Sequence, residues 1–277
     1  MTMHGYLLHR IDSLDLPELQ PYLTLRRAHE HLAQGIFVVE SAKVVRRFLV
    51  SDWNVVSLLL TPEWFDEIIP SLPVSRLDGA DVFVGEKQLL ETIVGFPLHQ
   101  GIMAVGKVPV ERSLHETVKL LPSPHFLVAF DGLVHAENVG TIVRNCAGFG
   151  VDGIVVSKTS ASPYLRRAVR NSMGGIFKLP SVHVADLAHA LSSLQQQYNT
   201  RIILADAHAN EAICDTNFSG NICIVLGNEN EGASRGVEAI ASTRVRIPMH
   251  NETDSLNVAS ASAVLLYEAR RGRTQPT

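Results

Sequence analysis

The sequence predicts an α/β protein of two domains, and three observations support this prediction. A chain of 277 residues exceeds an average domain, and its 46% apolar and 19% charged residues are the balance of an ordinary globular protein. Short apolar runs rich in β-branched residues alternate with segments of helical periodicity. In the second half these runs are separated by helices throughout, so we expect a parallel sheet that is covered on both faces.

The first half of the chain is expected to form a small α/β unit. We predict helices over residues 19–33, 41–48 and 62–69, and strands over residues 36–40, 55–60 and 101–105. Pro62 supports the start of the third helix, because proline is favoured in a first turn. Three prolines around a short helical piece mark residues 107–124 as a linker. The predicted domains are therefore residues 1–106 and 125–277.

The second half contains five predicted strands, over residues 126–130, 153–156, 201–205, 222–226 and 245–247. A last helix over residues 257–271 carries three alanines among serines. Such small residues permit the close approach of another backbone, either within the domain or between subunits. The tail after Arg271 is expected to be frayed.

The composition limits the class of protein. A net charge of −4 argues against a uniformly basic surface, so any contact with nucleic acid must use local arginine clusters. The three cysteines, Cys146, Cys214 and Cys223, match no paired pattern and are expected to be reduced core residues of a cytosolic protein. No run approaches the roughly 18 apolar residues of a membrane helix, and the first residues lack the pattern of a signal peptide. We therefore expect a cytoplasmic protein without a membrane partner.

Two patterns suggest a cofactor site or a metal site but do not have the context that such a site requires. Residues 148–153 match G-x-G-x-x-G, but a helical pattern precedes the glycines and a strand follows them, which reverses the order found in dinucleotide-binding folds. We expect these glycines to end a helix and to turn the chain into the next strand. His29 and His31 are two positions apart, which matches no metal-ligand spacing, so we expect no metal. No P-loop and no G-x-S-x-G string is present.

Three short segments, residues 226–232, 247–249 and 255–257, are the most informative part of the chain. They follow apolar strand-like runs, so their loops can converge at the carboxyl edge of a sheet, where a small cofactor would lie. Glycines at both ends of the first segment give its backbone unusual freedom, and Glu229 supplies a carboxylate. An equally acceptable interpretation is a helix entry that is capped by Asn228 or Asn230.

A fourth segment lies upstream, at residues 138–144. It places the amide of Asn138 and the guanidinium of Arg144 at the two ends of one loop-to-helix transition. Taken alone, this spacing is better explained by a helix cap and an exposed helix arginine.

Together the four segments resemble the ordered motifs of the SpoU/TrmH family of S-adenosylmethionine-dependent RNA ribose 2′-O-methyltransferases. The motifs are N-V-G-x-x-x-R at residues 138–144, L-G-x-E-x-E-G at residues 226–232 and I-P-M…S-L-N-V at residues 247–258. The resemblance covers about residues 126–271. It departs at residues 259–262, where A-S-A-S replaces serine, valine and alanines and unchanged packing is expected, and at Asn251, where a small residue is frequent.

Upstream, F-V-V-E-S-A-K at residues 37–43 and H-Q-G-I at residues 99–102 are similar to the small L30e-like substrate-binding domain that many members carry. The resemblance implies a SPOUT fold with a deep trefoil knot at the C-terminal end of the sheet, where S-adenosylmethionine is held. It also implies a homodimer formed at the knot through the last helix. The implied cofactor-binding residues are Ala205, Leu226, Gly227, Asn228, Ile247, Met249 and Leu256.

The catalytic residues that the resemblance implies are Asn138, Arg144, Glu229, Ser255 and Asn257. A guanidinium is not normally a base, so we expect Arg144 to hold a phosphate of the target and to favour loss of the proton from the 2′-hydroxyl. The amides and Ser255 would orient the arginine and the ribose, and Glu229 would hold that network.

Contact with RNA is expected from arginine clusters, whose phosphate contacts carry little sequence information. One cluster lies on a single predicted helix, and the other lies in the first domain, where a merely solvated surface is equally acceptable. The two clusters are Arg166, Arg167 and Arg170, and Arg26, Arg27, Lys43, Arg46 and Arg47.

The expected reaction is methyl transfer to a ribose 2′-hydroxyl of ribosomal RNA, which the first domain favours over transfer RNA. An alternative is a catalytically silent RNA-binding or ribosome-assembly factor with the same fold, although all five catalytic positions are intact. A third class, a nicotinamide-dependent oxidoreductase, would require the rejected glycine string to function.

Overall fold

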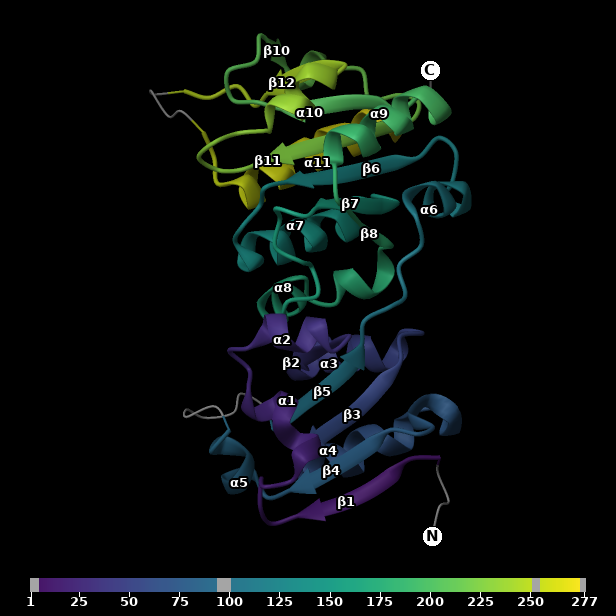
Figure 1. Ribbon diagram of the computed structural model, residues 1–277, viewed down its shortest axis with the longest axis vertical. Helices are drawn as coiled ribbons and strands as arrows, with labels where there is room; N and C mark the ends of the chain where they lie inside the picture. Colours follow the sequence, from purple (N-terminus) through teal and green to yellow (C-terminus); the bar gives the residue numbers. More distant parts are fainter. Residues whose placement is uncertain (1–4, 94–100, 251–254, 275–277) are drawn as a thin grey trace. The chain divides into compact units, whose positions relative to one another are not determined.

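The computed structural model describes residues 5–93, 101–250 and 255–274. The expectations for His99, Gln100 and Asn251 fall outside these ranges. The chain forms two compact units (Figure 1), of which unit 1 comprises Met1–Pro109 and Tyr164–Phe177 and unit 2 comprises Val110–Pro163 and Lys178–Thr277. The first division lies inside the predicted linker, whereas residues 164–177, between two strands of unit 2, belong with unit 1.

Unit 1 contains a five-stranded mixed sheet in the order β1-β4-β3-β5-β2. Strands β1, β4 and β3 are parallel, and β5 is antiparallel to both β3 and β2. The strands are β1 (Leu7–Ile11), β2 (Ile36–Glu40), β3 (Val55–Leu60), β4 (Asp81–Gly85) and β5 (Ile102–Lys107). The α-helices are α1 (Gln20–Leu23), α2 (Ala28–Ala33), α3 (Ala42–Val50), α4 (Pro62–Ile68), α5 (Lys87–Glu91) and α8 (Arg166–Asn171). Short 3-10 helices span Pro17–Leu19, Ile69–Ser71, Val74–Leu77 and Gly175–Lys178.

The predicted helix over residues 19–33 is interrupted at Thr24. Thr24 leaves the helical conformation, with φ = −106° and ψ = 36°, and ends α1. Its hydroxyl donates to the carbonyl of Gln20 at 2.7 Å and shares a hydrogen bond of 2.9 Å with Nε2 of buried His31. Strands β1 and β4 were not predicted. β1 is an edge strand with Leu7 and Leu8 exposed, and β4 is too short for its period to separate a strand from another buried segment.

Ser41 joins β2 to α3 with φ = +77°, a conformation that favours glycine. The helix nevertheless starts here, because the amides of Val44 and Val45 both donate to the Ser41 carbonyl and the apolar face of α3 is buried. Local backbone strain at Ser41 is therefore offset by the packing of the helix that follows it.

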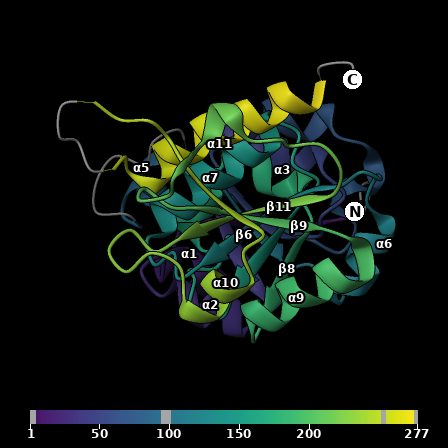
Figure 2. The ribbon, with the colours of Figure 1, turned by 90° about the horizontal axis from the view of Figure 1, so that it is seen from above.

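Unit 2 contains a seven-stranded sheet in the order β10-β12-β9-β11-β6-β7-β8, and every strand pairing among the described residues is parallel. Helices cover both faces, with α7 and α11 on one and α9 and α10 on the other (Figure 2). This confirms the predicted sheet. The strands are β6 (Phe126–Asp131), β7 (Gly153–Ser157), β8 (Ser181–Val184), β9 (Arg201–Ala205), β10 (Glu211–Ala212), β11 (Ile222–Gly227) and β12 (Thr243–Arg246). The helices are α6 (Leu114–Leu120), α7 (Ala136–Gly148), α9 (Leu187–Tyr198), α10 (Arg235–Ile240) and α11 (Val258–Thr274), with a 3-10 helix at Ile213–Asp215.

The glycine string behaves as predicted. Helix α7 ends at Gly148, Gly150 has φ = +71°, and β7 begins at Gly153. Strand β12 ends at Arg246, one residue earlier than predicted. Val245 already pairs with the last residue of β9, so Ile247 has no strand beside it.

Helix α11 continues to Thr274, so the expectation that the chain frays directly after Arg271 is wrong for residues 272–274, and residues 275–277 lie outside the described ranges. The guanidinium of Arg273 explains the difference, because it holds the last turn in place. It donates to the carbonyls of Phe218 at 3.1 Å, Gly220 at 2.6 Å and Pro124 at 2.8 Å.

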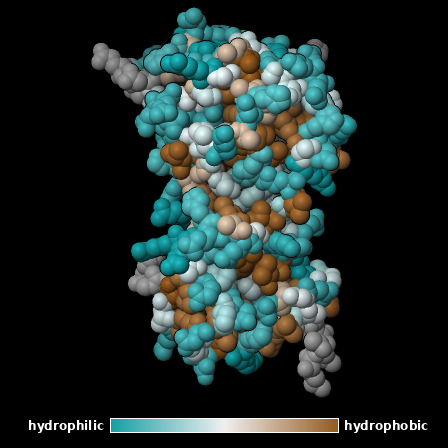
Figure 3. All heavy atoms as spheres, viewed as in Figure 1, coloured by the Kyte–Doolittle hydropathy of each residue, from teal (hydrophilic) through white to brown (hydrophobic). Residues whose placement is uncertain are grey.

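The visible surface of each unit mixes polar and apolar side chains (Figure 3). Cys146 and Cys223 are buried, as predicted, and burial raises the pKa of both thiols. Cys214 is exposed, contrary to prediction, because the neighbouring Ile213 takes the buried position of its 3-10 helix. Within the described ranges, no helix is long and apolar enough to cross a bilayer, and no three metal-ligating side chains form a group.

Candidate active site

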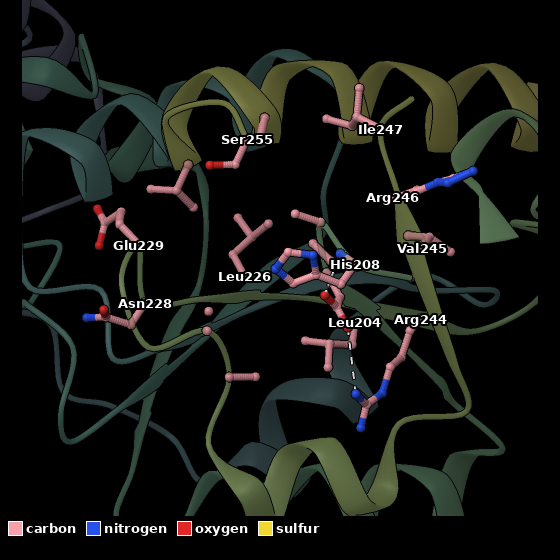
Figure 4. Close-up of a pocket in the computed structure, with 18 of the residues that line it drawn as sticks. Leu204, His208, Leu226, Asn228, Glu229, Arg244, Val245, Arg246, Ile247 and Ser255 are labelled. Atoms are coloured by element: carbon pink, nitrogen blue, oxygen red, sulfur yellow. Dashed lines mark hydrogen bonds and ion pairs between the residues drawn. The ribbon is translucent and has the colours of Figure 1, made fainter. Parts of the chain in front are cut away.

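A cavity of about 530 Å³ lies at the carboxyl ends of β9, β11 and β12, beside the start of α11 (Figure 4). Carboxyl ends of parallel strands meet at one edge of a sheet, so the three loops singled out in the sequence converge here. Residues 204–208, at the end of β9 and directly after it, complete the wall. The seven residues expected to hold a cofactor all line the cavity: Ala205, Leu226, Gly227, Asn228, Ile247, Met249 and Leu256.

The loop after β11 is a closed turn and not a helix entry. Asn228 and Gly232 exchange two backbone hydrogen bonds, of 2.8 and 3.0 Å. Oδ1 of Asn228 accepts from the amides of Asn230 at 2.9 Å and Glu231 at 3.1 Å. A Cβ atom on Gly227 would lie 2.6 Å from two backbone atoms of the returning chain, so this position requires glycine. Helix α10 begins only at residue 235, so neither Asn228 nor Asn230 caps a helix and the segment is a loop.

Three of the five expected catalytic residues meet at the rim of the cavity. Nδ2 of Asn138 donates to Oε1 of Glu229 at 2.5 Å, and Nδ2 of Asn257 donates to Oδ1 of Asn138 at 3.4 Å. These side chains come from α7, the loop after β11 and the residue before α11. Ser255 also lines the cavity. The structure therefore joins side chains that are 91 and 119 residues apart in the sequence.

Arg144 lies apart from this cluster. Its side chain is exposed, it does not line the cavity, and no hydrogen bond or ion pair joins it to another described residue. Both Arg144 and Asn138 lie inside α7, whose N-cap is His135, so Asn138 is not the cap of this helix. A charged side chain with free donors on the site helix remains available to a ligand from solution.

Sequence reasoning missed the two arginines on one side of the cavity. Arg244, which is labelled in Figure 4, forms ion pairs with Asp206 at 3.6 Å and Glu238 at 3.8 Å. Arg246 also lines the cavity, and its Nε is buried without a hydrogen-bond partner in the described part of the chain. The sequence R-V-R before I-P-M could have revealed them, because residues two positions apart on a strand point to the same face, so Arg244 and Arg246 lie on one side.

The expected RNA-binding arginines have different environments in unit 1. Arg166 is only 16% exposed; it forms an ion pair of 2.6 Å with Glu40 and donates to the Leu25 carbonyl at 3.2 Å. Arg170 is more exposed and reaches the same carboxylate at 3.3 Å. Arg166 therefore has a structural role in joining α8 to β2. Arg46 pairs with Glu67, and Arg47 donates to the carbonyl of Met173. The other expected residues, Arg26, Arg27, Lys43 and Arg167, are exposed.

Comparisons with known proteins agree with this site. The model of the SpoU rRNA methylase family matches residues 125–267. A protein of Mycobacterium tuberculosis named an uncharacterized tRNA/rRNA methyltransferase is 32% identical over 267 residues, which cover 93% of this chain and 90% of the relative. The 23S rRNA (guanosine-2′-O-)-methyltransferase RlmB of Xanthomonas axonopodis is 31% identical over 202 residues, which cover 72% of this chain and 81% of the relative.

The same fold occurs in a solved structure. The AdoMet-bound rRNA methyltransferase of Sinorhizobium meliloti superposes with a TM-score of 0.82 at 21% identity, covering 95% of this chain and 98% of that one. The family model spans the motif helix α7, the closed loop after β11 and most of α11. With its motif residues gathered at one cavity, the chain belongs to the SpoU rRNA methylase family.

Proposed function

We propose that this protein is an S-adenosylmethionine-dependent methyltransferase that modifies a ribose 2′-hydroxyl of ribosomal RNA. The observation that carries the proposal is the convergence of the motif loops on one cavity, with Asn138, Glu229 and Asn257 bonded together at its rim. Membership of the family supports methyl transfer. Ribosomal RNA is favoured over transfer RNA because relatives of the chain are named for 23S rRNA.

The lining of the cavity fits S-adenosylmethionine. Its volume of about 530 Å³ is in the range of small-molecule sites. Leu226, Ile247 and Leu256 would enclose the adenine. The cavity has more carboxylates than arginines, which suits a cationic sulfonium. The carboxylates are those of Asp206, Glu229, Glu231 and Glu238, and the arginines are Arg244 and Arg246. When bound, the cofactor supplies an electrophilic methyl group.

The rim cluster would orient the ribose. Glu229 fixes Nδ2 of Asn138, and this directs Oδ1 of the same amide towards Asn257. The hydroxyl of Ser255 adds a second polar group at the cavity. Placement of a hydroxyl in line with the methyl group can by itself supply several kcal/mol, up to roughly 7 to 11 in ideal cases.

Arg144 would hold a phosphate of the RNA. Its exposed guanidinium presents several donors in one plane, which matches phosphate geometry, and it stays protonated in proteins. It is therefore unsuited to act as a base. Positive charge beside the 2′-hydroxyl would favour loss of its proton to phosphate or water.

Unit 1 would bind RNA as an L30e-like domain through its exposed basic residues, with Arg166 holding α8 in place through Glu40. The expected trefoil knot at the carboxyl edge of the unit 2 sheet, and a homodimer formed there through α11, belong to the same proposal. Sedimentation equilibrium would test the dimer, since a monomer at the concentrations used for activity would contradict it. The cytoplasmic location expected from the sequence also stays a prediction.

The test of the function is transfer of a radiolabelled methyl group from S-adenosylmethionine to ribosomal RNA from cells that lack the protein, followed by nucleoside analysis. We expect 2′-O-methylated product with the wild-type protein. Arg144→Ala should abolish transfer and leave cofactor affinity nearly intact, because Arg144 does not line the cavity. Arg112→Ala, at another exposed arginine of unit 2, is the matched control and should keep full activity.

Three results would overturn parts of this proposal. Cofactor binding without incorporation into any RNA would favour the silent RNA-binding factor. Incorporation into transfer RNA alone would correct the substrate. Wild-type turnover by Arg144→Ala would remove the role assigned to that residue.

A further inference from the structure

Helices α7 and α11 carry two parts of the proposed active site, and they pack against each other. Helix α7 bears Asn138 and Arg144, and α11 begins directly after Asn257. The first two turns of α11 also line the cavity, through Val258, Ala261 and Leu265. The register between the two helices therefore sets the distance from the α7 residues to the cavity.

One side chain of α7 reaches directly into the backbone of α11. Nδ2 of Asn145 donates to the carbonyl of Ala259 at 3.1 Å and to Oγ of Ser262 at 2.9 Å. The Ser262 hydroxyl donates in turn to the same carbonyl at 2.7 Å, and Ser262 is fully buried. A buried hydrogen-bonded group of this kind fixes one register, because a shift along the helix would leave donors without partners.

The same residue of α11 is tied to the rim of the cavity. The amide of Ala259 donates to Oδ1 of Asn257 at 2.9 Å, and Nδ2 of Asn257 donates to Asn138 at 3.4 Å. Asn138 is bonded to Glu229. A continuous chain of hydrogen bonds thus runs from Asn145 through the first turn of α11 and back to the rim.

Ser262 stands where the family pattern has a small apolar residue, and that substitution was expected to leave the packing unchanged. The structure shows that the hydroxyl instead takes part in a polar contact with Asn145. We propose that Asn145 is a positioning residue for methyl transfer, which holds α7 in register with α11 so that Asn138 keeps its bonds to Glu229 and Asn257 at the rim of the cavity. This inference rests on the proposed function.

The first variant is Asn145→Asp, which keeps the shape of the side chain and removes its amide hydrogens. Near neutral pH a carboxylate would face the Ala259 carbonyl and could not donate to it. We expect kcat to fall about tenfold to 100-fold, as for other small misplacements of a site. The dissociation constant for S-adenosylmethionine should change by less than about threefold, because the side chain does not line the cavity.

The pH dependence of the same variant separates positioning from a general loss of structure. A protonated carboxyl can donate one hydrogen bond again, so the rate of Asn145→Asp relative to wild type at the same pH should rise as the pH falls. Ser262→Ala should lose less activity than Asn145→Asp, since Asn145 keeps the Ala259 carbonyl as a partner.

The matched control is Thr200→Val, which removes another buried hydrogen bond of unit 2, that of 2.8 Å to His125, and leaves the hydrogen bonds between Asn145 and α11 in place. It should lower the thermal midpoint and leave kcat unchanged. If Asn145→Asp lowers kcat no more than Thr200→Val does at a matched thermal midpoint, Asn145 has no positioning role. A relative rate that does not rise at low pH would lead to the same conclusion.

Hydrogen exchange separates failure of this inference from failure of the proposed function. Asn145→Asp should speed exchange of the amides in residues 258–262, whether or not methyl transfer occurs. Unchanged exchange there would overturn the inference. Faster exchange in a protein whose wild type transfers no methyl group would support the helix contact and reject the reaction.

Discussion

Replacement of Gly227 by alanine tests the geometry of the cavity wall most directly. The new Cβ atom would lie 2.6 Å from the carbonyl carbon of Gly232 and from the amide nitrogen of Ala233. These are backbone atoms, so the loop must open, and opening breaks the two hydrogen bonds between Asn228 and Gly232. Each hydrogen bond contributes about 1 kcal/mol, so breaking both costs about 2 kcal/mol of free energy. Since 1.4 kcal/mol corresponds to tenfold, S-adenosylmethionine should bind about 30-fold more weakly.

Isothermal titration of the cofactor into both proteins measures this difference. Gly148→Ala is the matched control, because its added Cβ meets no atom within 4 Å and its φ is not positive. This control should bind the cofactor as the wild type does and should be no less stable. If Gly227→Ala binds within about threefold of the wild type, the closed loop is not part of the binding site and the reasoning from its geometry is wrong.

Three further predictions concern stability. Ser41→Gly should raise the free energy of unfolding in urea by about 1 kcal/mol, because it relieves φ = +77°; a less stable variant would contradict the strain. Arg166→Ala should lower the free energy of unfolding by about 3 to 5 kcal/mol, because the Glu40 side chain, which is only 15% exposed, loses its main partner. Arg27→Ala, at a side chain that is 63% exposed, should have almost no effect. Burial lowers the pKa of His125, so this histidine binds a proton more readily in the unfolded chain than in the folded one. The stability of unit 2 should therefore be full above the ordinary pKa of 6.5 and should fall as the pH drops through the folded pKa. If the thermal midpoint of His125→Gln falls with pH as steeply as that of wild type, this prediction is wrong.

The central strands of unit 2, β6, β7, β9 and β11, could be predicted because they are buried on both faces, whereas β8 and β10, which are short and only partly buried, were not predicted. The sequences of the central strands are continuous apolar runs such as Ile222–Gly227 and Phe126–Asp131, and glycines or polar residues follow at the carboxyl edge. The strands of unit 1 gave weaker signals. Leu7–Ile11 lies at an edge, and Asp81–Gly85 has only three consecutive apolar residues, so neither shows a clear period.

The candidate site was predictable as a set of loops and much less as a set of contacts. Residue types and strand ends bring the motif loops to one edge, but no local pattern reveals which side chains meet across long distances in sequence. The pairing of Arg166 with Glu40 spans 126 residues, and that of Asn145 with Ser262 spans 117. Sequence patterns alone therefore assigned Arg166 to RNA binding and assigned no role to Ser262.

The discontinuity of unit 1 has a consequence for how the protein can be divided. Tyr164 and Phe177 pack against Phe37, Phe48 and Trp53, so a stretch of chain between two strands of the other unit completes the aromatic interior of the amino-terminal half. A single proteolytic cut at residues 107–113 would leave that stretch in place and could not release either half intact. Gene truncation at the same point would strip these aromatic rings of their neighbours, so the halves are expected to persist or disappear together during evolution.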